Sequence, residues 1–446
     1  MSAISPESIV NSEFDAAACE RLMTAARERR VWLRVGQLVD GESSRPIRDA
    51  SVVFDADVIH FVGGDGELPK PDELANGRKT PDAVLPNATL LPTLIEAHAH
   101  LFLDGAPIEA AEREAYLQRS SNSLLERARA RWGKILACGV GAVRDAGDKH
   151  GVGLTLATES KAQQVGRRTT PYLDSPGAAI HHRGRYGSFM GEPIEEHASA
   201  ADCVAERLAA GADRIKLLVS GIINFKAGRV TAPPQMPADE VAAIVGAARS
   251  AACQTFAHAS GADGIENAIE GGVDTVEHGF FVTRDQLARM RDRQVGWVPT
   301  FAPVALQLVQ ADELGHSREV AGHLERILAE HGAMLCHAAQ FGVPIIAGSD
   351  AGSCGVPHGL GLHDELVHME RAGLAPMSVL RSATGTSGRR LHIPEAIGRV
   401  APGYRSRMIL TVHDPLSTVE NLRREKLVLF DGLAIHCPAQ LDSTGL

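Results

Sequence analysis

The sequence lacks the marks of a membrane, secreted or nucleic-acid-binding protein. No apolar run reaches the about 18 residues that a membrane-spanning helix needs. The segment Met1–Glu7 has neither the basic start nor the apolar centre of a signal peptide. The seven cysteines are scattered without a CxxC pair, which favours reduced thiols. A net charge of −10 argues against nucleic acid or an anionic membrane as partner. We therefore expect a cytoplasmic protein.

The composition is that of an enzyme-sized globular protein. The chain has 446 residues, of which 44% are hydrophobic and 22% charged, so it can bury a large core. Helical spacing of apolar residues predicts an N-terminal helical extension within residues 1–30. Short alternating runs in residues 31–91 and again in 398–446 predict one small β-sandwich domain that is built from both termini.

The middle of the chain, residues 92–397, alternates between short apolar strands and helical stretches. The predicted strands are Leu90–His98, Gly141–Arg144, Tyr172–Ile180, Arg214–Val219, Gln254–His258, Thr275–His278, Gly296–Thr300 and Pro344–Gly348. The predicted helices include Ser121–Ala137, Ala200–Ala210, Ala238–Ala251, Gly261–Glu270, Thr283–Arg293 and Ser317–Phe341. This alternation predicts an α/β fold, a (β/α)8 TIM barrel. An open doubly wound sheet would need a glycine-rich phosphate turn after its first strand, and the sequence has none there.

Histidines stand where the predicted strands end. His98 and His100 are two apart, so a strand places both imidazoles on one face, where they can bind one cation. The active site of such a barrel lies at the carboxyl ends of its strands. Reading only the predicted strands and the residues directly after them adds four candidates to the histidine pair: Lys216, His258, His278 and Asp350. Together they predict a metal site, because imidazole and carboxylate ligands with open positions can activate water.

The same segments resemble the metal-dependent amidohydrolase superfamily. The matching segments are Ile95–His100 (IEAHAH), Val143–Gly147 (VRDAG), Arg214–Ser220 (RIKLLVS), Phe256–Ala259 (FAHA), Val276–Gly279 (VEHG) and Gly348–Gly352 (GSDAG). The tail Gly398–Gly403 resembles the family's return into its small sheet domain. The lysine on the fourth strand resembles the binuclear branch, and the imidazolonepropionase-like and prolidase-like amidohydrolases look most similar.

The resemblance implies a centre with two divalent metal ions. Protonated lysine has only donors, so Lys216 can bind metal only after it gains an oxygen. In similar enzymes the lysine reacts with carbon dioxide, and the resulting carbamate bridges two metals. His98, His100 and Asp350 would then hold the buried metal, and His258 and His278 the outer one. Zinc is the expected metal, while Co²⁺, Mn²⁺ and Fe²⁺ are chemically admissible.

The implied reaction is hydrolysis of an amide bond. A hydroxide that bridges the two metals would attack the carbonyl, with Asp350 as general base and then general acid. The expected substrate is a small molecule: an N-acyl amino acid, a dipeptide-like molecule or an aryl amide. Carbamate or ester hydrolysis and a mononuclear metal-dependent deaminase are the alternatives. A non-catalytic scaffold would lack one or more ligands, whereas all six are present. The resemblance leaves a homo-oligomer open.

Other residues are candidates for contacts with substrate or with the ligands. The residues proposed for substrate binding are His182, Arg183, Arg185, Tyr186, Phe301 and His358. Glu96 replaces the usual aspartate two residues before the histidine pair, and we expect it to influence metal affinity. We expect Glu277 to face away from His278 as a supporting residue and Arg144 to pair with an acid or reach the pocket. Ile222 and Ile223 place bulk near the pocket where the family has a glycine.

Overall fold

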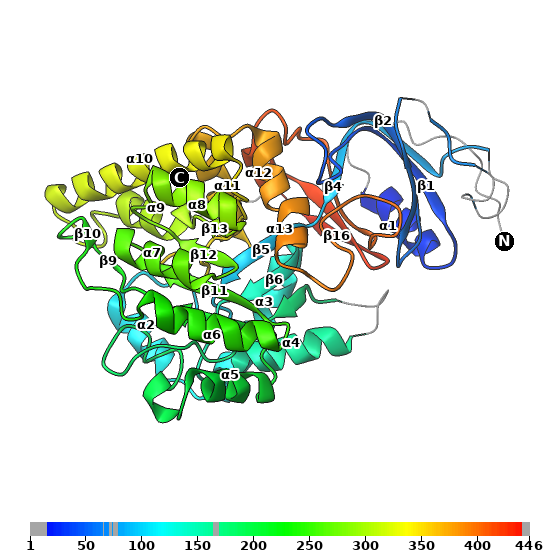
Figure 1. Cartoon of the computed structure of the whole chain (residues 1–446). Helices are drawn as coiled ribbons and strands as arrows, with labels where there is room; N and C mark the ends of the chain where they lie inside the picture. Colours follow the sequence, from blue (N-terminus) through cyan, green and yellow to red (C-terminus); the bar gives the residue numbers. More distant parts are fainter. Residues whose placement is uncertain (1–15, 66, 71–73, 75–78, 164–168, 439–446) are drawn as a thin grey trace.

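Strands from both termini form one mixed sheet at one end of the protein (Figure 1). The computed structural model describes residues 16–65, 67–70, 74, 79–163 and 169–438. The seven-stranded order is β16-β15-β14-β4-β1-β2-β3. The strand bounds are β1 Val31–Leu38, β2 Ile47–Phe54, β3 Ile59–Gly63, β4 Ala83–Pro92, β14 Arg407–Thr411, β15 Lys426–Phe430 and β16 Leu433–Cys437. Because β4 pairs with both β1 and β14, it joins the N-terminal strands to the C-terminal ones. Hydrogen bonding makes this a single continuous sheet, so a two-layer sandwich stays a prediction.

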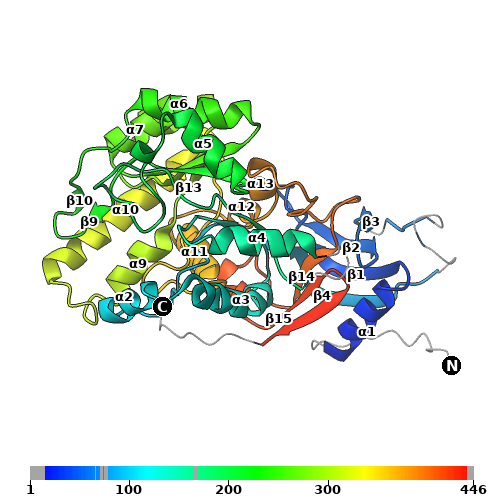
Figure 2. The same ribbon diagram turned by 90° about the horizontal axis from the view of Figure 1, so that it is seen from below.

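The N-terminal helix packs on this sheet. Helix α1 spans Ala16–Ala26 within the predicted extension, whose first residues lie outside the described part of the chain. Its Leu22, Met23 and Ala26 are buried in one apolar cluster with residues of β1 and β2. Seen from below, the sheet and α1 lie at one end of the molecule (Figure 2). Toward the other end lie α5 (Ala200–Ala209), α6 (Ala238–Ser250) and α7 (Ala262–Gly271).

Apart from the short pair β9 (Ile223–Asn224) and β10 (Arg229–Val230), the other strands are parallel and form two groups. One group is ordered β5-β6-β7, with bounds Leu94–Ala99, Val140–Asp145 and Tyr172–Asp174. The other is ordered β13-β12-β11-β8, with bounds Gly296–Val298, Thr275–His278, Gln254–Ala259 and Arg214–Leu218. Nearly every residue of these strands is buried, as expected where helices cover parallel strands. The predicted α/β class is therefore confirmed.

Two backbone links connect the groups. Between β7 and β8, Ile180 donates to the Lys216 carbonyl at 2.8 Å and Leu218 donates to the Ile180 carbonyl at 3.0 Å. On the other side, the segment 344–348 lies between β13 and β5. There Ile346 donates to the Trp297 carbonyl at 2.9 Å and Ala97 donates to the Ala347 carbonyl at 3.0 Å. The predicted eighth strand thus has cross-strand hydrogen bonds, although it is too irregular to count as a regular strand.

The predicted first strand was wrong in one respect. Leu90–His98 is not one strand, because β4 ends at Pro92 in the mixed sheet and β5 begins at Leu94 among the parallel strands. Thr93 marks the change, since its amide donates to the Arg407 carbonyl at 3.1 Å while Leu94 donates to Gly139 at 2.8 Å. An unbroken apolar run therefore hides a change of sheet.

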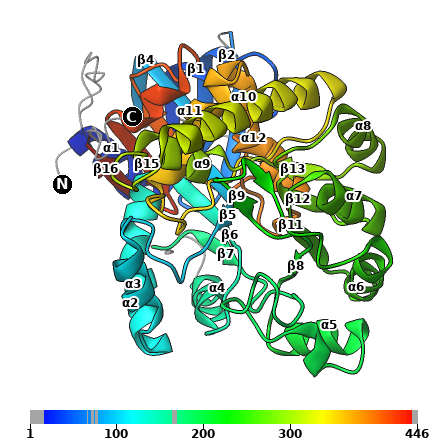
Figure 3. The same cartoon turned by 90° about the vertical axis from the view of Figure 1, so that its left-hand side faces the viewer.

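Helices surround the parallel strands (Figure 3). Their bounds are α2 Ala110–Leu117, α3 Ser121–Ala137, α4 Val152–Ala162, α5 Ala200–Ala209, α6 Ala238–Ser250, α7 Ala262–Gly271, α8 Arg284–Arg293, α9 Phe301–Val309, α10 Arg318–Phe341, α11 Leu360–Arg371, α12 Pro376–Ser382 and α13 Gly385–Arg390. Short elements are η1 Ile194–Glu196, η2 Val419–Arg423, β9 Ile223–Asn224 and β10 Arg229–Val230. The six predicted helices agree with the observed ones to within one residue at each end. Among the described helices, none combines the length and apolar character needed to cross a membrane.

Candidate metal centre

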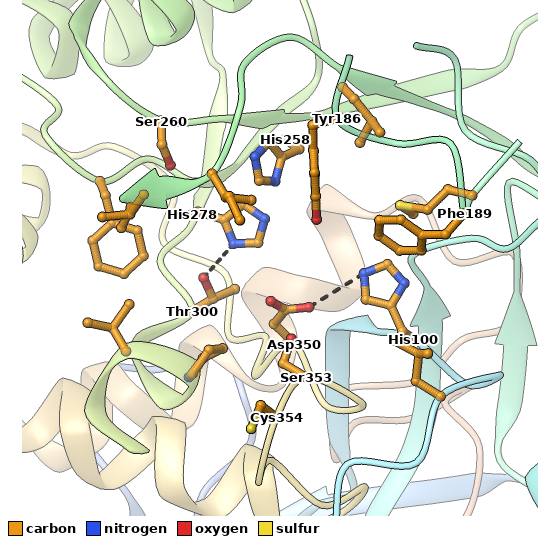
Figure 4. A pocket seen from close by; sticks show the side chains of 18 of the residues that line it. His100, Tyr186, Phe189, His258, Ser260, His278, Thr300, Asp350, Ser353 and Cys354 are labelled. Atoms are coloured by element: carbon orange, nitrogen blue, oxygen red, sulfur yellow. Dashed lines mark hydrogen bonds and ion pairs between the residues drawn. The ribbon is translucent and has the colours of Figure 1, made fainter. Parts of the chain in front are cut away.

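The six candidate ligands come together at the carboxyl ends of the parallel strands. His98 lies near the end of β5 and His100 directly follows it, while Lys216 lies on β8. On the neighbouring strands, His258 is the last residue but one of β11 and His278 is the last of β12, and Asp350 follows the segment 344–348. Figure 4 shows His100, His258, His278 and Asp350 around one cavity, with Tyr186 opposite Asp350.

The six side chains form two subgroups, and the members of each subgroup are in close contact with one another. Asp350 Oδ1 lies 3.6 Å from His98 Nε2 and 3.5 Å from His100 Nε2, and the three ligand atoms lie within 4.8 Å of one another. The rings of His258 and His278 have centroids 4.5 Å apart. Lys216 Nζ lies 3.4 Å from His98 Nε2. The predicted set is therefore one cluster rather than six separate residues.

Hydrogen bonds orient three of the four imidazoles. His98 Nδ1 lies 2.6 Å from Glu277 Oε2, and His278 Nδ1 lies 2.8 Å from Thr300 Oγ1 (Figure 4). His100 Nδ1 lies 3.3 Å from the Gly147 carbonyl. Each contact leaves Nε2 as the nitrogen available to a metal, which is how supporting residues normally fix a histidine ligand. His258 differs, since its Nε2 lies 3.3 Å from the Gly221 carbonyl.

The electrostatics of the cluster fit a bound cation. Asp350 Oδ1 is buried and accepts no hydrogen bond from any described residue, so it is an acceptor in need of a positive partner. Burial lowers the pKa of His100 to about 3 and that of His258 to about 4, which keeps both rings neutral as metal ligands must be. Burial also lowers the pKa of the Lys216 ammonium, which makes the neutral, reactive amine more available.

A buried ion pair supports His98 from behind. Glu277 is fully buried and accepts two hydrogen bonds of 2.9 Å from Arg144 while it contacts His98. Arg144 also donates to the Ala97 carbonyl at 2.6 Å and to Thr275 Oγ1 at 3.0 Å. Glu277 therefore supports a ligand, as expected, and Arg144 pairs with Glu277 rather than entering the cavity.

We expect Glu277→Gln to weaken both the fold and the metal site. The Arg144 charge would lose its buried partner, which costs roughly 3–5 kcal/mol of unfolding free energy. His98 would lose an anionic acceptor, with an expected drop in metal affinity of about 10–100-fold. Denaturant titration and metal titration measure the two effects. Glu365→Gln is the matched control, because burial raises the pKa of Glu365 and so favours its neutral form. Unchanged metal affinity in Glu277→Gln would contradict this role.

Glu96 ties the first and last ligand-bearing segments together. Its Oε1 accepts from the His98 amide at 3.0 Å and from the Ser349 amide at 2.9 Å, and its Oε2 accepts from Ser349 Oγ at 2.5 Å. Glu96 therefore holds the backbone beside Asp350 against the backbone of the histidine pair. Desolvation raises its pKa to about 7.

This raised pKa predicts a pH-dependent cost to the metal-free protein. The folded pKa of Glu96 exceeds its unfolded value, so Glu96 ionises more readily in the unfolded chain, and this lowers the free energy of unfolding. The loss of unfolding free energy is absent below about pH 4.5, grows toward pH 7 and is complete above pH 7. Glu96→Gln removes this titration and keeps an acceptor oxygen for both amides. We expect the variant to gain on the order of 2–3 kcal/mol over the parent between pH 4.5 and pH 8. Denaturant titrations at both pH values test this, and parallel curves for the two proteins would contradict it.

Five of the six candidate ligands, all but His98, line a cavity of about 410 Å³. Apolar side chains make up most of its walls: Leu103, Leu117, Phe189, Met190, Leu218, Ile222, Ile223, Phe225, Phe280, Pro303 and Val304. The polar side chains other than the ligands are Arg113, Tyr186, Ser260, Thr300, Gln307, Ser353 and Cys354. Ile222 and Ile223 thus reach the pocket, as the sequence indicates. A pocket of this kind suits a largely apolar small molecule with one or two polar groups.

Only one of the six predicted substrate-binding residues lines this cavity. Tyr186 does, and its ring lies 5.2 Å from that of His258. Two others are held by acids outside the cavity: His182 contacts Glu195 at 2.8 Å, and Arg183 pairs with Glu196. Arg185 also lies outside the lining and donates to the Pro233 carbonyl at 2.6 Å. Glu195 and Glu196 therefore bind two of the basic side chains of the loop 182–185. The residue types in that loop did not indicate this pairing.

The other two residues are buried behind the ligands. Phe301 packs against His331, with ring centroids 4.6 Å apart, and does not line the cavity. His358 Nε2 lies 3.1 Å from the His100 carbonyl, so it braces a ligand-bearing segment instead of facing substrate. For these two residues the predicted substrate contact does not fit the structure.

Sequence reasoning missed a charged wall residue. Arg113 lies on α2 and faces the cavity together with Leu117, one helical turn later. It donates to the carbonyls of Asp104, Pro107 and Gly352 at 3.1–3.3 Å but pairs with no carboxylate among the described residues. The position of α2 directly after the first ligand-bearing strand was the signal available in the sequence.

Comparison with known proteins agrees with this arrangement. The model of the amidohydrolase family matches residues 89–433. An ochratoxinase from Aspergillus niger is 25% identical over 429 residues, 88% of this chain and 83% of that protein. An uncharacterized protein from Mycobacterium tuberculosis is 25% identical over 354 residues, 79% of this chain and 86% of that one. The crystal structure of a Xaa-Pro dipeptidase with bound methionine has a TM-score of 0.75 at 24% identity and covers 91% of this chain and 100% of that one. The predicted resemblance is confirmed, and the chain belongs to the amidohydrolase family.

Proposed function

We propose that the protein is a metal-dependent hydrolase of amide bonds that binds two divalent ions. The observation that carries the proposal is the convergence of four imidazoles, one lysine and one aspartate in one cluster, of which all members but His98 line one cavity. The links at Ile180 and at residues 344–348 support closure of the parallel strands as a (β/α)8 barrel, whose carboxyl-end rim is where such sites lie.

The proposed ligand roles follow from the contacts. His98, His100 and Asp350 would hold the buried ion, and His258 and His278 the outer one. Lys216, as its carbamate, would contribute to both. Its formation balances simply: the neutral amine adds to carbon dioxide and releases one proton. Zinc is the proposed metal, because imidazole and carboxylate ligands suit it.

When bound, divalent ions supply an activated water and polarise the scissile carbonyl. The protein's own part is proton transfer and positioning. Asp350 accepts the proton of the attacking water at Oδ1 and delivers it to the nitrogen of the leaving amine. Glu277 keeps His98 in the tautomer that leaves Nε2 free, and Glu96 keeps Asp350 beside the histidine pair. The apolar walls exclude bulk water from the reacting groups.

The cavity favours hydrolysis over deamination. A deaminase of this superfamily tends to need a second carboxylate as proton shuttle near the fifth strand. Among the described residues that line the cavity, Asp350 is the only carboxylate. Carbamate and ester hydrolysis remain the second candidates, because the same groups can act on those acyl bonds.

The proposed substrates are amides of amino acids with a bulky apolar or aryl acyl group. The apolar walls would receive the acyl group, and the unpaired charge of Arg113 favours a substrate carboxylate. The name of one similar protein, a Xaa-Pro dipeptidase, supports an amide next to a carboxylate, which is what a dipeptide offers. The test is a panel of N-acyl amino acids, dipeptides, aryl amides, carbamates and esters, assayed with zinc and bicarbonate. Release of amine from N-aroyl amino acids is expected, and activity on esters alone would contradict the proposal.

We expect Arg113→Met to discriminate against charged substrates. Loss of one charge-assisted contact costs about 1.5–3 kcal/mol, or roughly 10–150-fold in kcat/KM for an N-acyl amino acid. The corresponding N-acyl amino acid amide, which has no carboxylate, should be affected little. Arg113→Lys is the control variant, because it keeps the positive charge and should therefore retain more of the activity on the N-acyl amino acid than Arg113→Met does. Equal losses on both substrates would indicate that Arg113 acts only through the loops that its hydrogen bonds hold.

A further inference from the structure

A second cavity lies at the opposite ends of the parallel strands from the metal centre. It has a volume of about 420 Å³. Gln294, two residues before β13, and Pro344, six residues before Asp350, line it, so it opens where the strands begin. Helices α12 and α13 supply the other wall, and Figure 1 shows them between the parallel strands and the mixed sheet. The second cavity shares no described lining residue with the cavity of the metal centre.

Of the described residues that line the second cavity, three are arginines and none is a carboxylate. Arg389 is already neutralised, since its Nη1 lies 2.7 and 2.9 Å from the carboxylate oxygens of Glu42. Arg390 donates through Nη2 to the Gln294 carbonyl, which carries no formal charge. Arg381 makes no side-chain hydrogen bond or ion pair with any residue that the structure describes. Two guanidinium groups, those of Arg381 and Arg390, therefore line the cavity and pair with no carboxylate of the described part of the chain.

The unpaired groups include buried atoms. The Nε atoms of Arg381 and Arg390 are both buried, and neither has a hydrogen-bond partner among the residues that the structure describes. Leaving a buried donor of a charged group unsatisfied costs free energy, and a bound anion in the cavity would offset that cost. Asp274 is the acid that interacts electrostatically with Arg390. It makes no hydrogen bond to Arg390 among the described contacts, and its carboxylate accepts from the amide of Thr255 at 2.7 Å.

We propose that the second cavity binds a phosphate-type dianion, either free phosphate or the phosphoryl group of a small phosphomonoester. Arg381 and Arg390 would donate to its oxygens, since a guanidinium matches phosphate geometry with paired N–H donors. The hydroxyls of Ser378 and Thr386 line the same space and offer further donors. The volume exceeds what one phosphate needs and leaves room for an organic substituent. A bound dianion would tie α12 and α13 to the start of the segment 344–348.

The test is calorimetric titration of the full-length protein with inorganic phosphate and with glycerol 1-phosphate, at ionic strength matched by chloride. We expect saturable binding and a rise in Tm with phosphate. Arg381→Gln should weaken this binding at least tenfold, while phosphate bound at the metal centre would persist in that variant. Tighter binding of glycerol 1-phosphate than of phosphate would identify the ester as the ligand.

A second variant guards against a folding defect. Thr386→Glu places a carboxylate in the cavity, so we expect a higher Tm without phosphate and loss of the phosphate response. Arg291→Gln is the control, because Arg291 is exposed and pairs with its neighbour Asp292. Equal phosphate affinity in the parent protein and in Arg381→Gln, or a Tm rise that chloride reproduces, would overturn the proposal.

Discussion

Replacing Lys216 with alanine is expected to abolish amide hydrolysis and to lower bound metal from about two ions per chain to one or none. Lys216 is 1% exposed and contacts His98 on one side and the Phe256 ring, 4.6 Å from Nζ, on the other. Lys216 also lines the cavity together with His258 and His278 of the other subgroup. We expect kcat/KM to fall by at least about 10³-fold, measured together with elemental analysis.

The control for this variant is a second buried lysine. Lys426 lies in β15 of the mixed sheet and donates to the Leu422 carbonyl at 2.7 Å. Lys426→Met is expected to change stability but to keep both metal content and kcat. If Lys216→Ala kept full activity and two ions, the lysine would not bridge the metals.

Asp350→Asn is expected to lower kcat by about 10²–10⁴-fold, the usual contribution of a positioned acid or base. Asparagine is the right replacement because Asp350 has a φ of 55°, a left-handed conformation that asparagine adopts readily. Burial raises the pKa of Asp350, so its charge destabilises the metal-free fold. The variant should therefore unfold at a higher denaturant concentration without metal while it binds metal more weakly.

Asp431→Asn is the matched control for that variant. Asp431 is also buried and has a φ of 45°, but it pairs with Arg407 in the mixed sheet. Its replacement should lower stability and leave kcat and metal content unchanged. An Asp350→Asn enzyme with the parent's kcat would show that another group moves the proton.

The ligand set could be predicted because it depends on local spacing. Two-residue periodicity within a strand puts His98 and His100 on one face, and the carboxyl ends of parallel strands meet at one edge. Helices such as α3 and α10 were predictable for a similar reason, since their apolar residues recur at helical spacing.

Contacts between distant segments could not be predicted in this way. Glu277 was expected to face away from its neighbour, yet His278 has a φ of 66° at the end of β12, which breaks the alternation of the strand. Both side chains can then serve the same centre from different sides. Arg183 looked like a substrate contact by residue type, and its partner Glu196 is 13 residues away. Which acid meets which arginine depends on tertiary packing.

The most direct test of the two-metal proposal is the metal content of the purified protein after reconstitution with zinc and bicarbonate, measured on the sample that is assayed with an N-aroyl amino acid. We predict about two zinc ions per chain and amine release that a chelator abolishes. One ion per chain with deaminase activity, or full hydrolysis after complete removal of metal, would contradict it.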